Sequence, residues 1–345
     1  MTIGTLRGLD FFCRPFEPPL SLTAFTLYTS RMRLSKKFPA FTLVETILCL
    51  VLTVVLLGGI PHAVYLCQLA LHAMSDAHAA QNRAEQVRAI IRPMVETCGY
   101  GVSKDPDDFR AAFELGGLAP FNWPGPISVV DGAAGTSGRE ASTCRIVYAI
   151  PSGIRTTQET RTTEDTFQVR VSATPGNLES HSTMPHSTKN WALFAAATPR
   201  FHPAWLTATS GTGPDGALLL LRRRGNGELL IPRNDELFYL RAAEIQVRAY
   251  DDGTNRDDFA LYTNDHTGSG WQPRVVGVVD ARFELADERR LLRVVMLVRG
   301  EKRYDRDVTT GTPDGWPAKW ADDIPQSARR YRLYAHSVAF NLKNF

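Results

Sequence analysis

The stretch from Phe41 to Ile60 constrains the fold of this chain more than any other feature. Its 20 residues are mostly apolar and carry one charge, Glu45, and they follow a basic cluster made of Arg31, Arg33, Lys36 and Lys37. A helix of about 20 apolar residues crosses the hydrocarbon core of a bilayer. The stretch therefore predicts a membrane-spanning helix whose basic flank lies in the cytoplasm.

Glu45 needs an explanation, because an ionisable group inside a spanning helix is costly and is retained mainly where it has a partner. It is the fifth residue of Phe41-Thr42-Leu43-Val44-Glu45, which follows the small residue Ala40. This segment resembles the processing site of type IV prepilins and type II secretion pseudopilins. Ala40 stands where that family usually has Gly, and it keeps the small size.

The resemblance implies both processing and assembly. A prepilin peptidase would cut between Ala40 and Phe41 and methylate the new amine. Glu45 would pair with the terminal amine of a neighbouring subunit, and a buried, compensated pair fixes axial register better than it adds stability. The partners that the resemblance implies are the peptidase, other pilin or pseudopilin subunits, an inner-membrane assembly platform and the lipid bilayer.

Residues 1–40 are expected to be a leader that the mature protein lacks. Translation starts either at Met1 or at Met32, which would give a short basic leader. Removing residues 1–40 leaves 33 basic and 34 acidic residues, so that the net charge changes from +3 to −1. A nearly neutral chain has no overall field that attracts nucleic acid, which is therefore not an expected partner.

The helix is predicted to continue through residues 61–98 as an amphipathic segment. Apolar residues recur there with helical spacing, and charged residues lie off that stripe. Pro61 predicts a kink, and Cys98-Gly99 predicts the end of the helix. The stripe is read as a face that docks on a folded domain, and it consists of Val87, Ile90, Ile91, Met94 and Val95.

Residues 99–345 are predicted to form an extracytoplasmic β-rich domain, which makes the fold class α+β. A short helix is expected around Phe109 to Leu115, a surface excursion at 173–203, and a hairpin at 217–231 whose turn contains Asn226-Gly227. Alternating or apolar runs predict further strands at 145–150, 166–172, 244–250, 274–285, 291–299 and 331–342.

The order and character of the last strands resemble the large minor pilins of the PilW type, with pseudopilins of the GspJ type as the alternative. The resemblance implies a low-abundance initiating or tip subunit, anchored in the inner membrane with its domain in the periplasm. A large globular domain would crowd a regular shaft. From another class, a membrane-anchored periplasmic enzyme or binding protein remains open.

Cysteines and one acidic loop are the other candidate site residues. Outside the cytoplasm disulfides persist, and Cys98 with Cys144 is the favoured pair, which leaves Cys67 over. The loop 251–258 offers oxygen ligands of the kind that calcium takes, although its spacing is not that of an EF-hand and a solvated turn is the simpler interpretation. The weak calcium candidates are Asp251, Asp252, Asn255 and Asp257.

Nothing in the sequence favours catalysis. It contains no Gly-x-Ser-x-Gly, no His-Glu-x-x-His and no phosphate-cradling glycine loop, so the chain is expected to be no enzyme and to need no cofactor. Arg222-Arg223-Arg224 could touch DNA phosphates, but basic residues at a strand end more often form a solvated edge.

Overall fold

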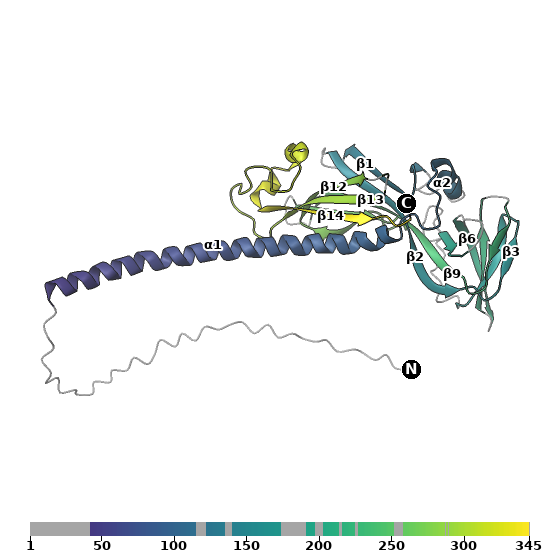
Figure 1. Cartoon of the computed structure of the whole chain (residues 1–345), viewed down its shortest axis with the longest axis horizontal. Helices are drawn as coiled ribbons and strands as arrows, with labels where there is room; N and C mark the ends of the chain where they lie inside the picture. The colour runs from purple at the N-terminus through teal and green to yellow at the C-terminus, as the bar shows by residue number, and fades with distance from the viewer. Residues whose placement is uncertain are drawn as a thin grey trace, which may run out of the picture. The chain divides into compact units, whose positions relative to one another are not determined.

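The computed structural model describes residues 42–114, 122–134, 140–173, 191–196, 203–213, 216–224, 227–251, 258–286, 288 and 290–344. These residues form an α+β fold, in which a long helix packs on an antiparallel β-sheet domain (Figure 1). The chain divides into two compact units, Met1–Ala63 and Val64–Phe345. The predicted fold class is confirmed.

The helix α1 runs from Leu43 to Glu96 and continues through Pro61 and Pro93, so neither proline ends it. It stops where the sequence predicts, because Gly99 has φ +69°, a left-handed conformation that glycine adopts without strain. In the part of α1 that runs from Leu43 to Ala63, every residue is exposed.

The second part of α1 buries one stripe of side chains. The stripe recurs every three or four residues, which places it on one face of a helix, and it comprises Asp76, Ala80, Ala84, Val87, Ile91 and Val95. Ile90 and Met94 are half-buried and pack against the same core. The predicted docking face is therefore confirmed, and it begins three turns earlier than the sequence pattern indicated.

The stripe packs in one core with a three-stranded sheet of order β12–β13–β14 and with part of a larger sheet. Figure 1 shows these three strands beside the C-terminal part of α1. All their pairings are antiparallel. Their bounds are β12 Val278–Ala286, β13 Leu291–Arg299 and β14 Leu333–Asn341.

The larger sheet has nine described strands, ordered β1–β2–β9–β5–β6–β7–β4, with β10 paired to β9 and β11 paired to β10. The bounds are β1 Ile127–Ala134, β2 Glu140–Arg155, β4 Thr166–Val171, β5 Trp191–Phe194, β6 Ala204–Gly213, β7 Gly216–Arg222, β9 Glu236–Tyr250, β10 Asp258–Asn264 and β11 Gln272–Val276. A separate two-stranded sheet joins β3 Thr160–Thr162 to β8 Leu229–Ile231.

The long strands β2 and β9 connect two hydrophobic cores. Cys144, Ile146 and Ile245 belong to the core around α1, whereas Val147 and Leu240 belong to a second core. The second core surrounds α2 (Pro106–Phe113), which lies where a short helix is predicted and has Asp105 as its N-cap. The Asp105 carboxylate accepts hydrogen bonds from two backbone N–H groups of the first turn, as an N-cap does.

Three strand predictions are wrong in detail. The predicted hairpin at 217–231 does not exist, because β7 pairs with β4 and β6 while β8 pairs with β3. The predicted strand 274–285 is two strands in different sheets, since Gly277 with φ +88° turns the chain between β11 and β12. Within the expected surface excursion, Trp191–Phe194 is a fully buried strand.

Candidate functional site

The N-terminal end of α1 holds the first candidate site, in which Glu45 and Thr42 bind one another. The Glu45 carboxylate accepts a hydrogen bond from the Thr42 backbone N–H at 2.9 Å and one from its hydroxyl at 3.1 Å. The Glu45 backbone N–H donates to the Thr42 hydroxyl at 3.3 Å. This reciprocal pattern is a capping box. Its signature, Thr-x-x-Glu, is present in the sequence, whereas the resemblance to prepilins concerns only the charge of Glu45.

The capping box defines where the Glu45 carboxylate lies. It faces the first backbone N–H groups of the helix, which carry partial positive charge. Ala40 and Phe41, the predicted cleavage residues, lie outside the described residues. A cut before Phe41 would place the new amine one residue before Thr42, whose N–H group Glu45 already binds.

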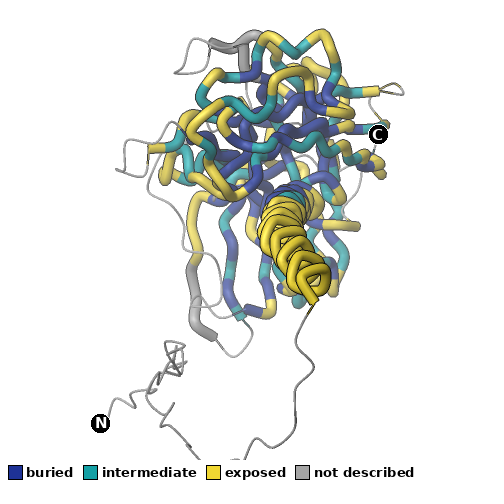
Figure 2. Tube along the Cα trace, turned by 90° about the vertical axis from the view of Figure 1, so that its left-hand side faces the viewer, coloured by how far each residue is buried: buried dark blue, intermediate teal, exposed yellow. Residues whose placement is uncertain are grey.

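Beyond Glu45, the first part of α1 presents apolar side chains on every side. Leu43, Val55 and Leu57 are among the large hydrophobic residues that are more than half exposed, and Figure 2 shows this part of the tube as exposed. The helix is long and apolar enough to cross a membrane. Exposed apolar surface on this scale predicts a nonaqueous or protein environment.

Asp76 anchors the second part of α1 to the domain and was not predicted. Its side chain is 2% exposed. One carboxylate oxygen accepts from the backbone N–H groups of Glu301 and Lys302, both at 3.0 Å, and the other accepts from the Tyr304 hydroxyl at 3.2 Å. A guanidinium nitrogen of Arg332 lies 3.9 Å away. A buried carboxylate is stable only when it is satisfied in this way.

Arg83 makes a second polar contact two turns along the same face. Its guanidinium donates to the Arg299 carbonyl at 2.7 Å, and burial together with the nearby Arg299 charge lowers its pKa. Arg299 in turn forms a two-point ion pair with Asp258, at 2.9 and 2.5 Å. A Cβ on Gly300 would approach the Asp76 side chain to 2.7 Å, so only glycine fits there. We call Asp76, Arg83, Asp258, Arg299 and Gly300 the α1 clamp.

The predicted disulfide is not formed in the structure. Cys98 and Cys144 are both buried in the core around α1, but each is a free thiol. Cys98 Sγ lies 3.6 Å from the Pro126 carbonyl oxygen as a hydrogen-bond donor. Burial raises the pKa of both thiols above the ordinary value for cysteine. Cys67 is exposed.

Only one of the four calcium candidates belongs to the described residues. Asp251 is an exposed residue at the end of β9, while Asp252, Asn255 and Asp257 lie outside the described residues. Within the part of the chain that the structure describes, no group of three or more His, Cys, Asp or Glu side chains has metal-binding geometry.

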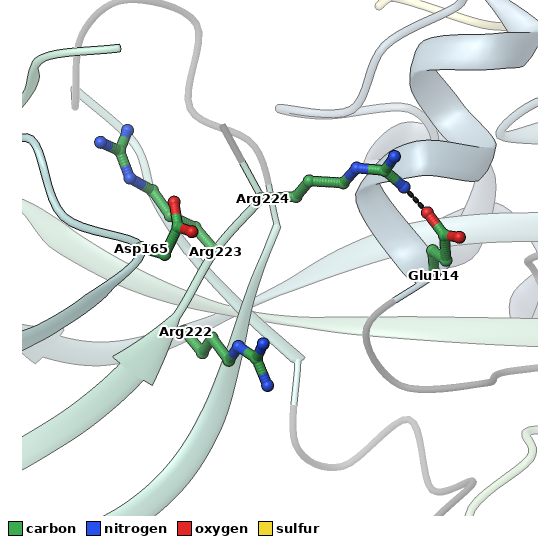
Figure 3. A pocket seen from close by; sticks show the side chains of 5 residues that line it. All are labelled: Glu114, Asp165, Arg222, Arg223 and Arg224. Carbon is green, nitrogen blue, oxygen red and sulfur yellow. Dashed lines mark ion pairs between the residues drawn. The ribbon is translucent and has the colours of Figure 1, made fainter. Parts of the chain in front are cut away.

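The three arginines that follow Leu221 line a cavity together with Glu114 and Asp165 (Figure 3). They do not form a uniform basic strip, because Arg224 is paired with Glu114 and Arg223 is buried.

Comparison with protein-family models, with curated proteins and with solved structures finds no match to this chain. A proposal for its function therefore rests on the residues of the N-terminal segment and on the geometry described above.

Proposed function

We propose that this protein is a minor type IV pilin: a structural subunit that a prepilin peptidase processes and that is assembled into a pilus at its initiation complex or tip. It has no catalytic role in this proposal. The basic cluster before α1 keeps the N-terminal side in the cytoplasm, which places the β-rich domain in the periplasm of a two-membrane cell.

The observation that carries the proposal is that a single carboxylate, Glu45, lies in an exposed apolar helix segment, Leu43 to Ile60, that has no other charge. A simple membrane anchor does not require Glu45, whereas a subunit that must be placed at a defined height beside its neighbours does. The Glu45 carboxylate already faces the helix start. In an assembly, the terminal amine of a neighbour would be a stronger partner than a neutral N–H group, because both partners would then be charged.

The capping box supplies a competing role for Glu45, and three variants separate the two roles. Glu45→Gln keeps a capping hydrogen bond, because Gln also serves in a capping box, but it loses the charge. Glu45→Ala loses both. Thr42→Ala removes the hydroxyl side of the box and leaves the charge intact. The measurement is the ratio of this protein in sheared filaments to that in membranes, together with the number of filaments.

Pairing with a neighbour's amine predicts that Glu45→Gln assembles as poorly as Glu45→Ala, at about one tenth of the wild-type level or less, whereas Thr42→Ala assembles normally. One lost charged partner corresponds to more than about 1.4 kcal/mol, which is tenfold in an equilibrium. The opposite order, with Glu45→Gln normal and Thr42→Ala defective, would assign Glu45 to helix capping and remove the main support for the proposal.

A further inference from the structure

The cavity at the end of β7 is built from charged residues of three separate segments. Arg222 ends β7 and is followed by Arg223 and Arg224, Asp165 directly precedes β4, and Glu114 follows α2. Its volume is about 180 Å³. Three guanidinium groups and two carboxylates give the lining a net charge of +1.

The three arginines differ in how far the protein itself neutralises them. Arg224 forms an ion pair with Glu114, and both side chains are about half exposed. Arg223 is 8% exposed, donates to the carbonyl of Glu164 at 3.3 Å and to that of Gly227, and has its pKa lowered by burial. These two carbonyl groups are neutral, and the nearby Asp165 carboxylate partly offsets the effect of burial on the Arg223 pKa.

Arg222 is the arginine that is left without a partner. Its side chain is exposed, and no residue in the described part of the chain forms a hydrogen bond or ion pair with it. Figure 3 shows it pointing away from Arg223. The charge that the cavity offers to a ligand is therefore that of Arg222, with Arg224 available if Glu114 releases it.

A half-buried aromatic residue lies opposite Arg222 on the neighbouring strand. Trp205 of β6 is the cross-strand partner of Arg222, and cross-strand partners project from the same face of a sheet. Trp205 is half-buried, and its ring meets Trp191 edge to face at 5.3 Å between centroids. Phe113 of α2 packs on Trp191 at 4.9 Å. The aromatic cluster thus packs against the second core, and its half-buried member Trp205 shares a sheet face with Arg222.

These features fit one ligand chemistry. We infer that the cavity binds a single carboxylate side chain from an acidic segment of a partner protein, with Arg222 as the primary contact. A guanidinium binds a carboxylate through two parallel hydrogen bonds, and the net charge of +1 matches one such group. Glu114 already presents a carboxylate to Arg224, so a second carboxylate from outside competes with it.

The same lining disfavours a polyanion. Phosphates follow one another along a nucleic acid at close spacing, so a strand with one phosphate at Arg222 brings further phosphates towards Glu114 and Asp165. The inference does not depend on pilus assembly, because the cavity lies in the β-rich domain and can be tested on purified protein whatever machine the protein serves.

The test uses the full chain in detergent micelles and a capped peptide, acetyl-Gly-Ser-Glu-Leu-Ser-Gly-amide, with the Glu replaced by Gln in a matched peptide. Binding is followed by NMR of ¹⁵N-labelled arginine side chains. We expect the Glu peptide to bind about tenfold more tightly than the Gln peptide and to shift the Arg222 resonance. Arg222→Gln should abolish this preference, whereas Arg161→Gln, which changes an exposed arginine on β3, should leave it unchanged.

Glu114→Gln provides a test with the opposite sign. It frees Arg224, so the Glu peptide should bind severalfold more tightly than it does to the wild-type protein. Equal binding of both peptides, no change with Arg222→Gln, or weaker binding with Glu114→Gln would each overturn the inference. It would also be overturned if inorganic phosphate or a ten-residue thymidine oligonucleotide bound more tightly than the Glu peptide. Arg222 and Glu114 are both exposed, so these variants are expected to fold.

Discussion

The two parts of α1 are one continuous helix but use their apolar residues in different ways. Between Leu43 and Ile60 the apolar side chains point in all directions and are exposed. Between Asp76 and Val95 they are confined to one stripe, which is buried against the sheets of the same chain. The docked part has its partner within the molecule, whereas the first part needs a partner outside it, either lipid or another protein.

The comparison also explains where the polar groups lie. In the docked part, Asp76 and Arg83 bind backbone groups of the segment 299–302, so their positions are set by the domain. In the first part, the contacts of the Glu45 carboxylate among the described residues are to Thr42 at the adjacent helix start. A polar group that the fold itself satisfies contributes to the stability of this molecule, and one at an unpartnered surface is available to a neighbour.

The largest effect should come from truncating the docked stripe. Ile91 is fully buried, so Ile91→Ala should reduce the free energy of unfolding of the domain by about 2–5 kcal/mol. Denaturant unfolding of the full chain in detergent, followed by tryptophan fluorescence, measures this. Leu50→Ala, at a position that is 63% exposed, is the matched control and should leave domain stability unchanged. Equal losses in both variants would contradict the division of α1 into two parts.

The next effect concerns the α1 clamp. Asp76→Ala removes the acceptor of three hydrogen bonds and leaves their donors unpaired, so we expect a loss of about 3 kcal/mol. Asp76→Asn keeps one carbonyl oxygen and should cost less, about 1 kcal/mol. Hydrogen exchange of the Glu301 and Lys302 amides should speed up in the same order. Glu85→Ala, which breaks an exposed pair with Arg88, should change stability by under about 0.5 kcal/mol.

A smaller, pH-dependent effect on the free energy of unfolding is expected from Glu244, which lies on β9 of the larger sheet. Burial alone would raise the pKa of Glu244, but the His266 imidazole at 3.5 Å and the Arg145 guanidinium, which donates a hydrogen bond at 2.9 Å, outweigh it and hold this pKa below its usual 4.5. A carboxyl group with a depressed pKa in the folded state stabilises the fold above the ordinary value, and this contribution is lost as the pH falls through the folded-state pKa.

Glu244→Gln should therefore cost about 1–2 kcal/mol at pH 7 and progressively less as the pH falls below 4.5. Urea unfolding of both proteins at a series of pH values measures the difference. A difference that stays constant down to pH 3 would show that Glu244 acts by packing and not by its charge.

The smallest effect is expected from a glycine in the first part of α1, and it concerns the stability of the helix itself. A Cβ added to Gly59 meets no atom within 4 Å, so the glycine is not required for space within this chain. Gly59→Ala should increase helix stability by about 0.5–1 kcal/mol and leave domain unfolding unchanged. Hydrogen exchange of residues 55–65 in micelles reports the change. Slower exchange is expected there, and faster exchange would mean that the glycine is needed for a contact.

The helix and the fold class could be predicted because they depend on local periodicity. The stripe at Val87, Ile91 and Val95 follows the helical repeat, and extending that repeat backwards through Ala80 reaches Asp76, so the anchoring residue was within reach of the same argument. The capping box was also readable, since Thr42 and Glu45 form its known signature. Neither was predicted, because apolar periodicity and net charge do not by themselves report a capping box or a buried carboxylate.

Strand pairing could not be predicted from local signals. The apolar run at β7 is correctly a strand, but its neighbours β4 and β6 are selected by long-range packing around Trp191, which a turn signal does not encode. The cavity at Arg222 likewise combines residues from three distant segments. Which arginine remains free depends on where Glu114 and Gly227 lie, and this is a property of the folded domain.

The mature N-terminus is the most direct test of the proposed function. The protein should be purified from cells with and without their prepilin peptidase, and its N-terminal peptide measured by mass spectrometry. Our account predicts an N-methylated Phe41 that is absent when the peptidase is absent. An intact leader, or cleavage at another bond, would contradict it and leave α1 as an ordinary signal anchor for the β-rich domain.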